Sequence, residues 1–193
     1  VHKATAEGFT HLWFVSTRLV INEGIAQILL KYVTRGPRDD MKSRPAVVGA
    51  AMPGHQFKEE KSWRPGEEAW ESYFISGETV PYNTCAIWDL KYLHPIGFLP
   101  VSEMPSNPEM AGVEEMATSL LQNRLFGTHV RTLLIGDIQQ QTAHWDDERR
   151  KRNEKIVSTK TERPRRQAEL LGLTDESRQV SGYPLAYYIN LIL

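Results

Sequence analysis

The fold class of this chain is decided by residues 129–138, which read HVRTLLIGDI. Leu133, Leu134 and Ile135 form a near-continuous apolar run, which is typical of a strand that is covered on both faces. Strands of this kind occur chiefly in sheets that carry helices on both sides. The stretch therefore predicts a buried strand in a protein that contains both helices and a sheet.

Two amphipathic core helices are predicted upstream of this strand. The first follows Asn22, a residue type that caps helix N-termini, and ends before Gly36 and Pro37. The second begins at Asn107 and ends at Gly127, and we expect its apolar stripe to lie in the core. The apolar residues recur with helical spacing, at Ile25, Ile28, Leu29, Tyr32 and Val33 in the first helix and at Met110, Val113, Ala117, Leu120, Leu121 and Leu125 in the second.

Further strands are predicted over residues 11–21, 46–52 and 79–92, and residues 67–75 fit a short helix or strand. Nine of the eleven prolines fall within residues 37–108, which excludes long helices there. The order of elements predicts an α/β or α+β fold: a single domain with a mixed sheet, two amphipathic core helices and a charged helical C-terminal extension.

Length and composition suit one globular core. The chain has 193 residues, 40% of them hydrophobic, with 23 Lys and Arg against 24 Asp and Glu. We expect a core over residues 1–138 and an extension over 139–193, helical to about 157, whose apolar tail docks on the core. The longest apolar run, 46–52, is far shorter than the roughly 20 residues of a membrane span. A single cysteine, Cys85, favours a reducing compartment, so we expect a cytoplasmic protein without a membrane partner.

A basic segment over residues 149–166 indicates a nucleic-acid partner. It holds nine Lys or Arg and two acids, a net charge of +7 against -8 for the rest of the chain. Basic side chains placed on phosphates release counterions and strengthen binding. However, the acids at 146–148 precede the basic residues at 150–152 by four positions, which also fits a solvated helix stabilised by its own ion pairs. The candidate contacts to DNA or RNA are Arg149, Lys155, Lys160, Arg163, Arg165 and Arg166.

The end of this segment matches half of a helix-turn-helix motif. Ala168 and Gly172 are four residues apart, as the tight corner of that motif requires. A second helix after Thr174 would be limited to about eight residues, because Gly182 and Pro184 would end it. An ordinary helix that ends in a glycine cap explains the same pattern.

A second candidate site lies in the run of residues 85–91, CAIWDLK, where a strand would place Asp89 and Lys91 on one face. In nucleases with a paired-acid-and-lysine site, such a strand presents a carboxylate to Mg²⁺ and a lysine to the attacking water. Glu78 or Glu71 would supply the second carboxylate. Acid-x-Lys triplets occur three times in the sequence, so polar residues at the exposed end of a strand explain the same pattern without a site.

A third candidate site follows the buried strand that opened this section. Asp137 lies at its carboxyl end, where α/β proteins place ligands. His144 is near enough, across a strand-to-helix turn, to form an acid–base pair with Asp137. His129 is about 26 Å from Asp137 along an extended chain and is excluded from this site. A helix cap at Asp137 beside an exposed His144 explains the same residues.

The function expected first is nucleic-acid binding through the basic segment and the partial helix-turn-helix, without a cofactor. The alternative is an enzyme: either a nuclease whose Mg²⁺ is held by Asp89 and Glu78, or a small-molecule hydrolase or transferase that uses Asp137 and His144. The sequence contains no glycine-rich nucleotide-binding motif and no Gly-x-Ser-x-Gly elbow. Its six histidines show no local metal-ligand spacing. Because several motifs are half complete, a designed chain fits the sequence as well.

Overall fold

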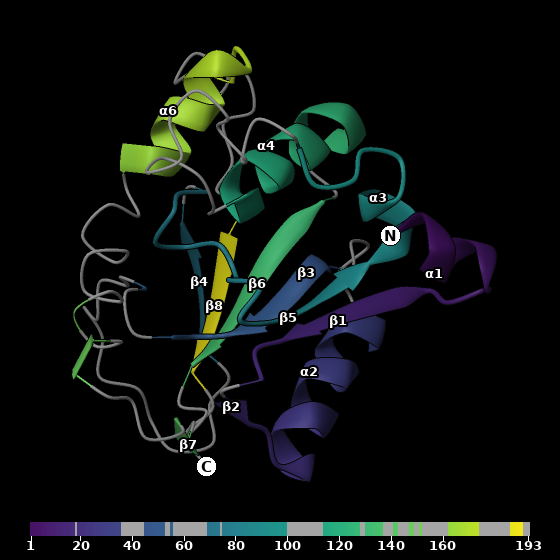
Figure 1. The fold of residues 1–193 in the computed structure, drawn as a ribbon, viewed down its shortest axis with the longest axis vertical. Helices are drawn as coiled ribbons and strands as arrows, with labels where there is room; N and C mark the ends of the chain where they lie inside the picture. The colour runs from purple at the N-terminus through teal and green to yellow at the C-terminus, as the bar shows by residue number, and fades with distance from the viewer. Residues whose placement is uncertain are drawn as a thin grey trace.

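The structure is a computed structural model, shown in Figure 1. It describes residues 1–17, 19–35, 45–52, 55, 69–73, 75–99, 114–127, 130–136, 141–142, 147–148, 151, 162–173 and 186–190.

A six-stranded mixed sheet forms the centre of the molecule, with the strand order β1-β5-β3-β6-β8-β4. Strands β3, β6 and β8 run parallel to one another, whereas β5, β1 and β4 pair antiparallel with their neighbours. A separate antiparallel pair joins β2 and β7. The strands are β1 His11–Val15, β2 Leu19–Val20, β3 Pro45–Ala50, β4 Ala69–Tyr73, β5 Cys85–Asp89, β6 Arg131–Gly136, β7 Gln141–Thr142 and β8 Ala186–Asn190.

Helix α2 covers one face of this sheet (Figure 1). Asn22 caps it, because its Oδ1 accepts a hydrogen bond from the Ile25 N–H at 2.9 Å, and this confirms the predicted start. The buried residues of α2 pack on alternate residues of the strands, as expected when side chains alternate between the two faces. The core cluster between α2 and the sheet contains Ile25, Leu29, Tyr32, Val33, Val48, Ala50, Cys85, Ile87, Leu133 and Ile135. The helices of the structure are α1 His2–Ala6, α2 Glu23–Arg35, α3 Leu90–Leu93, α4 Glu114–Phe126 and α6 Glu162–Leu170.

A second cluster lies against the opposite face of β3 and β5. Val47, Ala86 and Trp88 contribute from the strands, and Leu90 and Leu93 contribute from α3. Trp88 is fully buried and is the largest side chain in the interior of the described residues. The sheet is therefore covered on both faces, as the apolar run of β6 predicts.

Helices α4 and α6 pack together, and their contact corrects one expectation. The predicted apolar stripe is confirmed in part, because Ala117 is buried and Leu120 and Leu121 pack against the cluster shared with α6, whereas Leu125 is 58% exposed. Met110 and Val113 lie outside the described residues. The other buried residues of α4 are largely polar, which the apolar pattern does not predict. Its buried polar residues are Glu115, Thr118, Ser119, Gln122 and Asn123.

Two predicted strands and one predicted helix have different bounds in the structure. The strand expected over 11–21 is interrupted after Val15 by Ser16, whose N–H donates to the Thr84 carbonyl. The strand expected over 79–92 spans only Cys85–Asp89, because Asp89 starts a helix. At the start of the helix expected over 139–157, Gln141–Thr142 form a strand. Residues 46–52 and 129–138 do contain the predicted strands, and residues 67–75 contain β4.

These elements define an α+β fold with a mixed sheet in one domain. Residues beyond 138 belong to the same structure, because β8 lies inside the sheet between β6 and β4, and α6 packs on α4. No helix among the described residues is long and apolar enough to cross a bilayer.

Candidate functional site

The Asp89 and Lys91 pair does not have the geometry that a nuclease strand requires. Asp89 is the last residue of β5 and the N-cap of α3, where its carboxylate accepts the Lys91 N–H at 2.8 Å. Lys91 therefore lies on a helix, and its Nζ is 5.1 Å from the centre of the neighbouring Tyr92 ring. The expectation that both side chains share one face of a strand is wrong, because the cap ends the strand between them.

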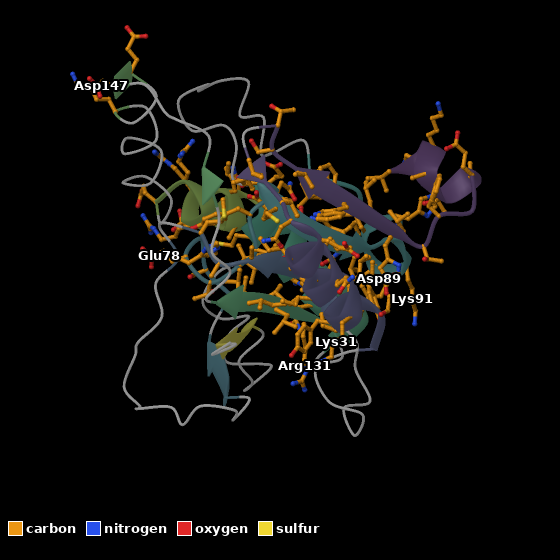
Figure 2. The ribbon with its side chains drawn as sticks, turned by 90° about the horizontal axis from the view of Figure 1, so that it is seen from below. Lys31, Glu78, Asp89, Lys91, Arg131 and Asp147 are labelled. Carbon is orange, nitrogen blue, oxygen red and sulfur yellow. The ribbon has the colours of Figure 1, made fainter. Side chains whose placement is uncertain are left out.

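Glu78 is too distant to complete that site. It lies in a turn before β5, and its backbone N–H donates to Ser76 Oγ. Figure 2 shows Glu78 on one side of the molecule, and Asp89 and Lys91 on the other. The expected Mg²⁺ pair of Asp89 and Glu78 is therefore not brought together. The alternative carboxylate, Glu71, lies on β4 at the far edge of the sheet from β1.

The two roles of Asp89 are separated by a pair of substitutions. We expect Asp89→Ala to lower the free energy of unfolding by about 1 kcal/mol, because it removes an N-cap, whereas Asp89→Asn retains the cap and changes it little. Urea unfolding measures both. A carboxylate that bound Mg²⁺ would be lost equally in both variants, so Mg²⁺-dependent DNA cleavage that disappears in Asp89→Asn would contradict the capping role.

The basic segment is described at Lys151, which is exposed, and at its end, on α6. Arg163 is buried, at 7% exposure. Arg165 forms ion pairs within its own helix, with Glu162 at 3.0 Å and Glu169 at 2.7 Å, as the solvated-helix interpretation expects. Arg166 is exposed. The other candidate contacts, Arg149, Lys155 and Lys160, lie outside the described residues.

Helix α6 ends in the glycine cap that the sequence indicates. Gly172 has a φ of +65°, a conformation that glycine adopts without strain. The Leu173 N–H then donates to the Ala168 carbonyl at 2.8 Å, which closes the last turn. The second helix of a helix-turn-helix would follow Thr174, outside the described residues, so that motif stays a prediction.

The carboxyl ends of the three parallel strands lie level with one another. Ala50 pairs with Ile135, and Gly136 pairs with Asn190. The Ala51 N–H continues this alignment by donating to the Ile135 carbonyl at 2.9 Å. The predicted pair of Asp137 and His144 lies outside the described residues. The edge is where proteins with parallel strands commonly bind ligands.

A group of polar side chains, here named the strand-end cluster, lies beside this edge and consists of His55, Glu78, Tyr82, Asn83 and Glu115. They come from the segment after β3, the turns before β5 and the first turn of α4. Register places the turns here, because β5 is antiparallel to β3 and so begins where β3 ends. The cluster therefore combines residues that are up to 60 positions apart in the sequence.

Asn83 connects the cluster to α4 and to the core. Its backbone N–H donates to Glu115 Oε1 at 2.7 Å, and its side-chain amide donates to Glu114 Oε1 at 2.8 Å. Its Oδ1 accepts from the Trp88 indole N–H at 2.8 Å. Glu115 is buried, so the hydrogen bond from Asn83 offsets part of the cost of removing its carboxylate from water. The orientation of both side chains is thus fixed by the fold.

His55 supports the cluster rather than offering a free base. Its Nδ1 lies 2.7 Å from the Met52 nitrogen and 3.1 Å from the Met52 carbonyl oxygen, and its Nε2 lies 2.9 Å from the Val80 carbonyl oxygen. The ring stacks on Tyr82 with centroids 3.8 Å apart. The Tyr82 hydroxyl in turn donates to the Gly77 carbonyl at 2.9 Å. These contacts hold the loop after β3 against the turns before β5.

The electrostatic environment of the cluster is negative. Burial, then the carboxylates of Glu115 and Glu78, raise the pKa of the Tyr82 hydroxyl well above its usual value, so Tyr82 is neutral at physiological pH. The labelled basic side chains Lys31 and Arg131 lie apart from Glu78, toward the lower middle of Figure 2. No set of three or more His, Cys, Asp or Glu side chains that would suit a metal ion occurs among the described residues.

Stability is expected to fall above about pH 9, because two buried acids ionise only in the unfolded chain. Burial raises the pKa of the Cys85 thiol as well as that of Tyr82, above unfolded values of about 8.5 and 10. The stabilisation is complete below those values and is lost as the pH rises past them, at up to about 1.4 kcal/mol per pH unit for each group. Urea unfolding of Tyr82→Phe should show a shallower decline above pH 10. An unchanged slope would show that Tyr82 ionises in the folded state.

Cys85 is otherwise a buried part of the core, at 1% exposure, where a free cysteine packs as a small hydrophobic residue. The sequence interpretation did not find Tyr82, Asn83 or Glu115. The available signal was weak: acidic residues in the first turn of a helix, and an asparagine just before a strand.

A comparison of the chain with known protein families and with curated proteins found no match.

Proposed function

We propose that the chain binds a small polar molecule at the strand-end cluster. The observation that carries the proposal is the hydrogen-bonded pair of Asn83 and Glu115, held beside the level carboxyl ends of β3, β6 and β8. Small-molecule sites commonly combine a mostly apolar surrounding with a few fixed polar groups. Here Ile75, Val80 and Met116 supply an adjacent buried apolar cluster.

The charge of the cluster selects the class of ligand. Glu78, Glu114 and Glu115 are carboxylates, and Tyr82 is neutral at physiological pH. A ligand with an amino group or several hydrogen-bond donors would be attracted, whereas a phosphate would be repelled. An enzyme of the hydrolase or transferase type that uses Asp137 and His144, which lie outside the described residues, is the form of this proposal that includes catalysis.

The proposal is tested with a panel of small primary amines, neutral polyols and phosphate monoesters of similar size, using ligand-observed NMR. Amines are expected to bind best and phosphate monoesters least. In Glu115→Gln the side chain loses its charge but still accepts the Asn83 N–H, so the variant should stay folded. We expect it to bind amines about tenfold more weakly, which corresponds to a loss of about 1.4 kcal/mol in binding free energy. The matched control is Glu7→Gln, on an exposed glutamate of the α1 C-cap. Equal loss in both variants, or preferred binding of phosphates, would reject the site.

Nucleic-acid binding is a second candidate, favoured by the exposed positions of Arg165 and Arg166 at the end of the +7 segment. Under this candidate, Arg165→Ala with Arg166→Ala should weaken DNA or RNA binding uniformly across sequences and flatten its salt dependence by roughly one unit per lost phosphate contact. Binding that is absent at low salt, or unchanged in the double variant, would reject nucleic-acid binding as a function.

The buried thiol of Cys85 supports a further proposal of a reducing compartment such as the cytoplasm.

A further inference from the structure

We propose that His2 and His94 form a binding site for a divalent transition-metal ion such as Zn²⁺. Nδ1 of His2 lies 3.1 Å from Nε2 of His94, although the two residues are 92 positions apart in the sequence. The rings are nearly perpendicular, with an interplanar angle of 80° and centroids 4.9 Å apart. This site is independent of the strand-end cluster and its proposed ligand.

The core holds the two histidines at this distance. His2 is the first residue of α1, and His94 is the C-cap of α3. Ala4 of α1 packs against the buried cluster that contains Leu90 and Leu93 of α3. Because the two short helices share this apolar contact, the imidazoles are brought together by the fold and not only by their own hydrogen bond.

The spacing of the two nitrogens fits a shared metal ligand set. Two Zn–N bonds of 2.0–2.1 Å at a tetrahedral angle place the nitrogens about 3.3 Å apart, close to the distance in the structure. In the metal-free pair one ring donates a proton to the other. A tautomer change in the donor ring moves that proton to its other nitrogen, so that both facing nitrogens become available to the metal.

Imidazole is a preferred ligand of Zn²⁺, Ni²⁺ and Cu²⁺. His2 is exposed and His94 is half-buried, so an ion reaches the pair from solvent and water completes its coordination. The site has only two protein ligands among the described residues, which predicts an affinity below that of a four-ligand structural zinc site. Local spacing in the sequence gives no sign of it, because the ligands belong to different helices.

The test is isothermal titration of ZnCl₂, and separately of NiCl₂, into tag-free protein at pH 7.5. We expect saturable binding of one ion per chain, reversed by EDTA. His2→Ala and His94→Ala should each weaken binding by at least about tenfold, since even the loss of a group that only orients a metal ligand costs 10- to 100-fold.

The matched control is His11→Ala, which removes a histidine whose Nδ1 is 2.9 Å from Thr10 Oγ1 and which lies outside the pair. The metal affinity of His11→Ala should equal that of the unaltered chain. His94→Asn provides a second, conservative variant, and circular dichroism verifies that each variant is folded. Absence of saturable binding would overturn the proposal, as would equal affinity in the His2, His94 and His11 variants.

Discussion

Replacing Trp88 with alanine is expected to lower the free energy of unfolding by about 3 to 5 kcal/mol, the range for large aromatic residues in a core. Trp88 is fully buried between the sheet and α3, and it contacts Phe98 edge to face with centroids 5.3 Å apart. Its indole N–H also donates to Asn83 Oδ1 at 2.8 Å. The loss therefore combines a large cavity with a polar group that has lost its partner.

Trp88→Phe separates these two contributions. Phenylalanine fills most of the volume but cannot donate to Asn83, so we expect a loss of about 1 to 3 kcal/mol, mainly from the unpaired oxygen. Urea unfolding of both variants gives the values. A Trp88→Phe variant as stable as the unaltered chain would show that the hydrogen bond to Asn83 contributes nothing to stability.

Replacing Gly49 with alanine is expected to lower the free energy of unfolding by about 3 kcal/mol, the upper part of the range for overpacked cores. An added Cβ would lie 2.6 Å from the Cβ of Pro81 and 2.9 Å from the carbonyl oxygen of Cys85. Favourable contacts between carbons occur at about 3.5–4.0 Å. Alanine normally gains about 0.5–1 kcal/mol over glycine in a strand, but the clash with backbone exceeds this gain.

The control is Gly24→Ala on α2, where the added Cβ lies 3.3 Å from the side-chain Oδ1 of Asn22. A side-chain atom moves more easily than a strand backbone, and alanine favours a helix, so the change there should stay within about 1 kcal/mol. Chemical denaturation of both variants makes the comparison. If Gly49→Ala were as mild as Gly24→Ala, β3 and the turn at Pro81 would not be packed as closely as the structure has them.

The elements that the sequence predicts well are those whose signals are local. Helix α2 combines a cap at Asn22 with helical apolar spacing, and β6 is a continuous apolar run, so each is specified by about a dozen neighbouring residues. Strand β5 is predicted only in part. The sequence pattern locates its apolar residues but also places Asp89, the N-cap of α3, in the interior of the strand, because an aspartate suits a helix start and an exposed strand end alike.

The pairing of strands depends on contacts between distant residues and is not specified locally. Strand β8 pairs with β6 and β4, which lie more than 50 and 110 positions upstream. The polar buried side of α4 is similarly hidden, since polar helix residues normally face solvent and only the layers around the helix reverse this. The strand-end cluster results from both effects: the register of β3 and β5 brings Asn83 to the start of α4, where Glu115 meets it.

The most direct test of the strand-end cluster is a map of backbone amide chemical shifts in ¹⁵N-labelled protein during titration with a primary amine that binds in the ligand panel. We expect shifts concentrated at Met52, His55 and Asn83 and in the first turn of α4, and we expect these shifts to be lost in Glu115→Gln. Shifts confined to α1, α3 or the β1 edge, with the protein folded throughout, would contradict a ligand site at the carboxyl ends of β3, β6 and β8.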